Sequence, residues 1–194
     1  MNYRLTDKSL DQTPIRLVDI GAWPKRNSIL EVVGYCEWFD WSGLFVEEAP
    51  ESLFRICREF GTSLVQMACL AIDGPSERIT SLRVIEIEPD HLASSYFNAI
   101  WDDRSTSFGR LAAMARIVAV WDPRQRWVVV NDRFYEIGMF AVLDDDVHPF
   151  KSGFFDKLDQ QELLSRFSQI LRIDRDAALK EVERWQERWD YALR

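Results

Sequence analysis

Apolar residues recur at helical spacing in two stretches of the first half of the chain. In each stretch every one of them lies three or four residues from another, so that one face of a helix would be apolar. These residues are Leu53, Phe54, Cys57 and Phe60 in the first stretch, and Leu92, Tyr96, Phe97 and Ile100 in the second. Pro50 and Gly61 bound the first stretch and Pro89 begins the second; proline at a helix start and glycine after its end are typical boundaries. The pattern predicts helices over 50–60 and 89–101.

Other stretches are short, rich in β-branched residues and bounded by turn residues, which is typical of strands. The apolar run 63–73 and the alternating run 79–88 are separated by a turn that contains Gly74 and Pro75, so they predict a hairpin. Three later runs, separated by short polar turns, predict an antiparallel meander. The predicted strands cover residues 28–35, 63–73, 79–88, 116–121, 126–131 and 134–143.

The two ends of the chain differ in pattern. Residues 1–27 are mostly polar and contain turn signals, so they predict an irregular N-terminal arm. Residues 154–194 predict two helices, the first over 156–171 and the second over 174–193, with Asp174 as the N-cap of the second.

Helices and strands that are grouped rather than strictly alternating are typical of the α+β type of fold. We therefore predict a single domain over residues 1–194 of α/β class (α+β type). Its mostly antiparallel sheet is flanked by helices, and the C-terminal helical pair packs on the sheet. A chain of this length can bury a full hydrophobic core.

The chain is acidic, with 32 Asp and Glu residues against 24 Lys and Arg and a formal net charge of −8. Such a surface repels phosphate backbones, which argues against nucleic-acid binding, and it attracts a basic protein partner. We expect no signal peptide and no membrane span, because the N-terminus lacks an apolar stretch and no run reaches about 18 apolar residues. Cys36, Cys57 and Cys69 are widely spaced and are expected to be buried, reduced thiols. The expected location is the cytoplasm.

The strong catalytic motifs are missing from the sequence: it has no phosphate-binding Gly-rich loop, no G-x-S-x-G elbow, no His-Glu-x-x-His and no Cys-x-x-Cys. Two acidic clusters remain as alternatives. Asp102 and Asp103 could do acid–base work if one were desolvated, and the turn Asp144–His148 carries groups that suit a metal ion. Both clusters, and His91 at a helix start, also fit solvated loops. We predict no catalytic residue, no cofactor and no metal site.

The segment Glu31–Glu51 combines acidic and aromatic residues and contains no Lys or Arg. Aromatic side chains are the usual anchors of protein interfaces, and acids beside them would select a basic partner. The alternative is that the aromatic side chains face the core while the acids are merely solvated. The residues predicted to contact a partner are Glu37, Trp38, Asp40, Trp41, Glu47 and Glu48.

Residues 126–140 place an apolar strand led by Trp127 before an Asp-Arg turn and a second predicted strand, 134–143, that contains Glu136. This arrangement resembles a strand-turn-strand pattern of small bacterial proteins. Several of these are cytoplasmic immunity proteins that neutralise toxins of contact-dependent and related polymorphic toxin systems. The resemblance implies a protein that binds and blocks a cognate toxin domain and has no catalysis of its own. The acidic charge agrees, because nuclease toxins present basic active sites. A small hydrolase or transferase using the acidic clusters, or an adaptor domain without a toxin partner, are the alternative functions.

Overall fold

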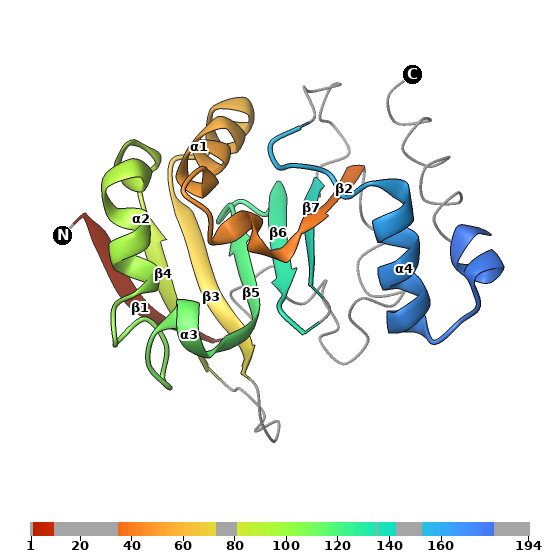
Figure 1. Cartoon of the computed structure of the whole chain (residues 1–194). Coiled ribbons are helices and arrows are strands. Elements are labelled where there is room, and N and C mark those ends of the chain that lie inside the picture. The colour runs from red at the N-terminus through yellow and green to blue at the C-terminus, as the bar shows by residue number, and fades with distance from the viewer. Residues whose placement is uncertain (1, 10–34, 73–80, 135, 143–152, 181–194) are drawn as a thin grey trace.

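The computed structural model describes residues 2–9, 35–72, 81–134, 136–142 and 153–180 (Figure 1). Within these residues seven strands form one antiparallel sheet in the order β1-β4-β3-β5-β6-β7-β2. The strands are β1 (Tyr3–Ser9), β2 (Tyr35–Asp40), β3 (Val65–Ile72), β4 (Ser81–Ile87), β5 (Ala115–Trp121), β6 (Trp127–Asp132) and β7 (Ile137–Val142). The helices are η3 (Trp41–Leu44), α1 (Ala49–Phe60), η4 (Pro89–His91), α2 (Leu92–Ile100), α3 (Leu111–Met114) and α4 (Gln160–Leu171). This confirms the α+β class with a mostly antiparallel sheet.

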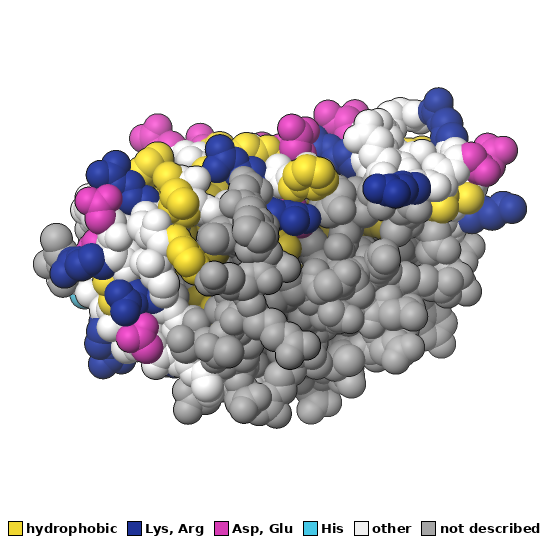
Figure 2. Space-filling model, turned by 90° about the horizontal axis from the view of Figure 1, so that it is seen from below, with side chains coloured by type: hydrophobic (Ala, Val, Ile, Leu, Met, Phe, Trp, Pro, Cys, Tyr) yellow, Lys and Arg dark blue, Asp and Glu magenta, His cyan; other side chains and the backbone are white. Residues whose placement is uncertain are grey.

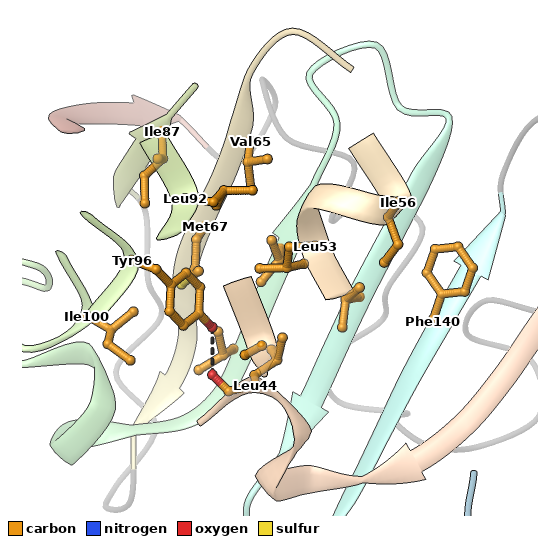
Figure 3. Packing of buried hydrophobic residues seen from close by; sticks show 14 of the residues in the cluster. Leu44, Leu53, Ile56, Val65, Met67, Ile87, Leu92, Tyr96, Ile100 and Phe140 are labelled. Atoms are coloured by element: carbon orange, nitrogen blue, oxygen red, sulfur yellow. Dashed lines mark hydrogen bonds between the residues drawn. The ribbon is translucent and has the colours of Figure 1, made fainter. Parts of the chain in front are cut away.

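Helices α1 and α2 lie side by side over one face of the sheet (Figure 1). Leu53 of α1 and Leu92 of α2 are fully buried and belong to one cluster with Met67 and Phe140 of the strands (Figure 3). Gly61 ends α1 in the left-handed conformation, with φ 58°, which glycine adopts without strain. Both predicted helices are confirmed, as are the β3–β4 pairing and the β5–β6–β7 meander.

The C-terminal part of the chain crosses the β2 edge of the sheet. Phe154 and Phe155 belong to the core cluster on the α1 and α2 side, whereas Leu163, Leu164 and Phe167 of α4 pack on the other face. Residues 157 and 158 lie alongside β2: Lys157 forms a β-bridge with Phe39, and the N–H of Leu158 donates to the carbonyl of Trp38 at 3.2 Å. Helix α4 begins after Asp159, whose carboxylate accepts the N–H of Glu162 in a capping box. The helix therefore begins later than the sequence predicts, because the residues before it pair with the edge strand.

The last predicted helix is described from residue 175 to residue 180. Asp174 acts as its N-cap, as predicted, because its carboxylate accepts the N–H of Ala177 at 2.8 Å. Ala178 is fully buried against the cluster that contains α4. The rest of this predicted helix, with Trp185 and Trp189, lies outside the described residues.

An edge strand stands where the sequence predicts an irregular arm. Residues 3–9 form β1 and pair with β4 along their whole length, so the prediction for 1–27 is wrong at these positions. The strand forms because Tyr3 and Leu5 pack against the core while polar side chains on it make ion pairs with β4. The rest of the arm lies outside the described residues.

The first predicted strand, 28–35, lies outside the described residues except for its last position. The structure begins β2 at Tyr35 and extends it to Asp40, inside the segment that the sequence assigns to partner binding. β2 pairs with β7 at the edge of the sheet opposite β1. Three of the predicted contact residues, Glu37, Trp38 and Asp40, therefore belong to an edge strand of the sheet.

A buried carboxylate joins β1, β4 and β3. Glu86 is 5% exposed and accepts hydrogen bonds from Arg4 at 2.6 Å, Gln66 at 2.7 Å and the ammonium of Lys8 at 3.0 Å. Burial alone would raise the pKa of Glu86, but the hydrogen bonds from Lys8, Arg4 and Gln66 outweigh burial and hold its pKa below the usual value. The charged form of Glu86 therefore stabilises the attachment of β1.

We expect this attachment to be sensitive to acid. Because the folded-state pKa of Glu86 is lowered, its contribution is fully present above the unfolded-state value, about 4.3, and is lost as the pH falls through the folded-state value. Glu86→Gln should cost about 2 kcal/mol of unfolding free energy at pH 7, measured by urea denaturation. The difference from the parent chain should shrink at pH 3; an equal difference at both pH values would contradict this role.

The described cysteines behave as the sequence predicts. Cys57 and Cys69 are buried, free thiols, while the side chain of Cys36 lies outside the described part. Burial, together with the nearby charge of Asp122, raises the pKa of Cys57 to about 12, so its thiol is unreactive at neutral pH. Among the described helices, none has the length and apolar character needed to cross a membrane.

Candidate partner-binding groove

Two of the six predicted contact residues are buried inside the chain. The carboxylate of Glu37 is 1% exposed and pairs with the ammonium of Lys157 at 2.9 Å, while the N–H of Gly153 donates to it at 3.1 Å. Trp38 is 4% exposed, and its ring packs edge-on against Phe167 of α4 with centroids 5.2 Å apart. Glu37 and Trp38 are therefore structural residues, which corrects their assignment to a partner.

Asp40 and Trp41 are half-buried and are also engaged within the chain. Asp40 accepts the N–H of Ser42 at 2.9 Å, which caps η3, and pairs with Arg166 of α4 at 2.9 Å. Burial alone would raise the pKa of Asp40, but hydrogen bonds from Ser42 and Arg166 hold it below the usual value. The guanidinium of Arg133 lies over the ring of Trp41, 5.6 Å from its centroid. The basic partner of this part of the acidic segment is thus the chain itself.

Glu47 and Glu48 are the predicted contact residues that remain exposed. They lie between η3 and α1, at the entrance to an open groove of about 530 Å³ between α1 and α2. Glu47 lines this groove and Glu48 is its neighbour in the chain. The groove is lined by Glu47, Pro50, Glu51, Phe54, Pro89, Asp90, Ala93 and Phe97.

The floor of the groove is apolar and comes from two helical stripes. Phe54 of α1 and Phe97 of α2 are half-buried, and both pack against the core beneath them. Ala93 precedes Phe97 by one helical turn and leaves room above the floor. The hydroxyl of Tyr96 donates to the carbonyl of Leu44 at 2.6 Å (Figure 3). This bond ties α2 to the segment that leads into α1, so it holds the two walls of the groove in place.

The rims of the groove are negatively charged. Glu47 and Glu51 stand on the α1 side and Asp90 on the η4 side, and all three side chains are exposed. None of the three has an ion-pair partner among the described residues. Among the lining residues that the structure describes, none is a lysine or an arginine. Its apolar floor and uncompensated carboxylates together suit a partner that is both apolar and basic.

Comparisons with protein-family models, curated proteins and solved structures found no match. The chemistry of the groove is therefore the basis for a functional conclusion.

Other exposed apolar side chains differ from the groove in their charges. Figure 2 shows the end of the molecule where α3 lies, with hydrophobic side chains beside basic and acidic ones. In and before α3, the large exposed apolar residues are Trp101, Phe108 and Met114. The neighbouring arginines are already paired, Arg104 with Asp102 and Arg110 with Asp103. These two arginines and their carboxylate partners thus neutralise each other within the chain, unlike the rim carboxylates of the groove.

The alternative catalytic carboxylates lie in this same loop. Asp102 accepts hydrogen bonds from the guanidinium of Arg104 at 2.7 Å and the hydroxyl of Tyr3 at 2.6 Å. These bonds hold the pKa of Asp102 far below its usual value, whereas a general acid or base at neutral pH needs a pKa near 7. Asp103 is exposed and pairs with Arg110 at 2.6 Å. The arrangement stabilises a loop and the N-terminal strand.

The remaining candidates for chemistry are His91 and the turn 144–148. The side chain of His91 is half-buried, and a ring nitrogen lies 3.3 Å from the side-chain amide of Asn2. The turn 144–148 lies outside the described residues. In the described part of the chain, no three His, Cys, Asp or Glu residues come together in a way that could hold a metal ion.

The sequence identified one residue of the groove, Glu47, and its neighbour Glu48. It missed Phe54 and Phe97, which its periodicity assigned to the core, and it placed Asp90 only at a helix start. A usable signal is present at the start of the first helix: acids and apolar residues recur at spacings of three and four between Glu47 and Phe54. The packing of α1 beside α2 cannot be read from either segment of the sequence alone, because β3 and β4 separate the two helices in the chain.

Proposed function

We propose that this chain is an immunity-type protein that works in the cytoplasm, where it binds a toxin domain and neutralises it through the groove between α1 and α2. One observation carries the proposal: an apolar floor is rimmed by Glu47, Glu51 and Asp90, which have no cationic partner among the described residues. Carboxylates in this setting favour the lysine and arginine side chains of another protein. A toxin whose basic active surface is covered in this way cannot reach its substrate.

Two further features support the proposal. The net charge of −8 would speed the encounter with a basic partner, because long-range attraction raises association rates. The buried thiols of Cys57 and Cys69 suit a reducing compartment such as the cytoplasm. A hydrolase or transferase acting through Asp102 has less support, because its carboxylate is held ionised by Arg104 and Tyr3.

Charge reversal on the two rims should weaken toxin binding through the association rate. The rim variant combines Glu47→Lys with Asp90→Lys, on opposite sides of the groove. We expect its association rate with the toxin domain to fall about tenfold at low salt and the difference to shrink in 0.5 M NaCl. The partner to test is the product of the gene immediately upstream, and surface plasmon resonance measures both rates.

A matched control carries the same change of net charge elsewhere. Glu59→Lys combined with Asp156→Lys reverses two exposed carboxylates outside the groove and should slow association far less. Both variants should keep the parent unfolding midpoint. In cells, the parent chain should restore growth during toxin expression and the rim variant should not. Growth arrest that the parent chain fails to relieve, or equal rates for the two variants, would overturn the proposal.

A further inference from the structure

We infer that the groove between α1 and α2 receives an amphipathic helix whose apolar stripe is flanked on both sides by lysine or arginine. The inference rests on the groove of the proposed function and names the kind of structure that enters it. It follows from the shape of the groove, from the placement of its small and large side chains, and from the distribution of its carboxylates.

The groove has the dimensions of two helical turns. Along α2 and the turn before it, Pro89, Ala93 and Phe97 line the wall at intervals of four residues, which corresponds to a stripe roughly 12 Å long. A helix that presents apolar side chains at positions i, i+4 and i+7 covers a similar length, roughly 10 Å. A volume of about 530 Å³ exceeds the space that one side chain fills, so several side chains of one occupant fit together.

The floor of the groove favours a helix over a single inserted side chain. The groove is bounded by α1 on one side and α2 on the other, and a third helix packs into a concave strip of this kind. Ala93 is the smallest side chain of the lining and leaves room beside the rings of Phe54 and Phe97, which form the floor. A third helix would cover the exposed edges of both rings, and apolar burial of this kind drives helix-in-groove recognition.

The carboxylates lie on both sides and toward both ends of the groove. The end of α1 leads into the start of β3, and the end of β4 leads into η4 and α2. Val65 at the start of β3 pairs with Ile87 at the end of β4. The end of α1 and the start of α2 thus lie at the same end of the sheet. The two helices are therefore antiparallel. Glu47 at the start of α1 and Asp90 at the start of η4 then stand at diagonally opposite corners, so an occupant needs cations on both flanks of its apolar stripe.

A peptide experiment tests this occupant directly. The probe is a helix of about 14 residues, held by a lactam bridge, with leucines at i, i+4 and i+7 and lysines on both flanks. Its binding to the whole chain is measured by fluorescence anisotropy. We expect saturable binding that is at least tenfold tighter than that of a lactam-bridged peptide of the same composition in scrambled order. A peptide with glutamates in place of the lysines should not bind.

A variant that fills the groove with a larger side chain tests the inference without changing any charge. Ala93→Trp places a large ring in the room that Ala93 leaves and should weaken peptide binding at least tenfold, whereas Ala113→Trp, at an exposed alanine of α3, should not. Thermal unfolding of both variants checks that the fold is kept. Equal affinity for the ordered and scrambled peptides, or equal binding by the two tryptophan variants, would overturn the inference.

The two proposals fail in different ways. Toxin binding that requires Glu47 and Asp90, together with no binding of the helical peptide, would overturn the helix as occupant and leave the proposed function standing. Peptide binding that is lost in Ala93→Trp, in a chain that does not relieve the toxin, would overturn the proposed function and leave the helix-binding groove standing.

Discussion

Replacement of Val129 by aspartate is expected to leave the chain unfolded at neutral pH. Val129 is fully buried in the middle of β6, between Val120 of β5 and Phe140 of β7. A carboxylate at this position would be surrounded by apolar side chains, and an unpaired buried charge costs several kcal/mol even after relaxation. The total stability of a domain is about 5–15 kcal/mol, so this single change removes most or all of it. Near-UV circular dichroism and limited proteolysis would measure the loss.

Two controls separate charge from position. Val129→Thr keeps the shape of the side chain and adds a hydroxyl group, so it should cost about 2 kcal/mol and still fold. Arg124→Asp places the same new carboxylate in the exposed turn between β5 and β6 and should leave the near-UV spectrum unchanged. A folded Val129→Asp protein with the stability of the parent chain would show that β6 does not have this central place.

Trp38→Ala is expected to destabilise the folded chain by about 3–5 kcal/mol, the usual cost of truncating a buried large aromatic residue. Trp38 is 4% exposed and packs against Phe167 of α4, so its removal leaves a cavity between the sheet and the C-terminal helix. Urea denaturation followed by far-UV circular dichroism measures the change. The expected result differs from that of an interface anchor, whose truncation would weaken binding and leave the stability unaltered.

The comparison with an exposed tryptophan sharpens this test. Trp101 is 51% exposed at the end of α2, so Trp101→Ala should change the unfolding free energy by less than about 1 kcal/mol. Trp38→Phe, which keeps an aromatic ring against Phe167, should recover part of the loss. Equal unfolding midpoints for Trp38→Ala and Trp101→Ala would contradict the structural role of Trp38.

The elements that the sequence predicts best are those whose pattern is local. Helix α1 has its apolar face, its proline and its terminal glycine within one stretch of chain, and the strands of the β5–β6–β7 meander follow one another through short turns. β1 has no such pattern, because polar residues on it are stabilised by distant partners. Arg4 and Glu86 are 82 residues apart, and no window around Arg4 contains a sign of Glu86.

The difference between local patterns and long-range contacts also explains why the sequence predicted only part of the groove. An acidic segment with aromatic residues was visible, but the side of the chain that each residue faces depends on long-range pairs such as Glu37 with Lys157. Glu37 and Trp38 lie buried on the edge strand β2, so their role is structural. Phe54 and Phe97 line the same groove only because the pairing of β3 with β4 brings α1 and α2 together.

The order of the strands also determines when each strand can pair while the chain is being synthesised. β1 and β2 are made first, yet they close the two opposite edges of the sheet, against β4 and β7. A nascent chain that ends before residue 81 carries both of these strands and neither of their partners. β2 must wait still longer, until residues 137–142 have been made. Long-range pairing of this kind slows folding and leaves strand edges exposed in the meantime, so among the strands that the structure describes β2 waits through the longest stretch of synthesis for its partner.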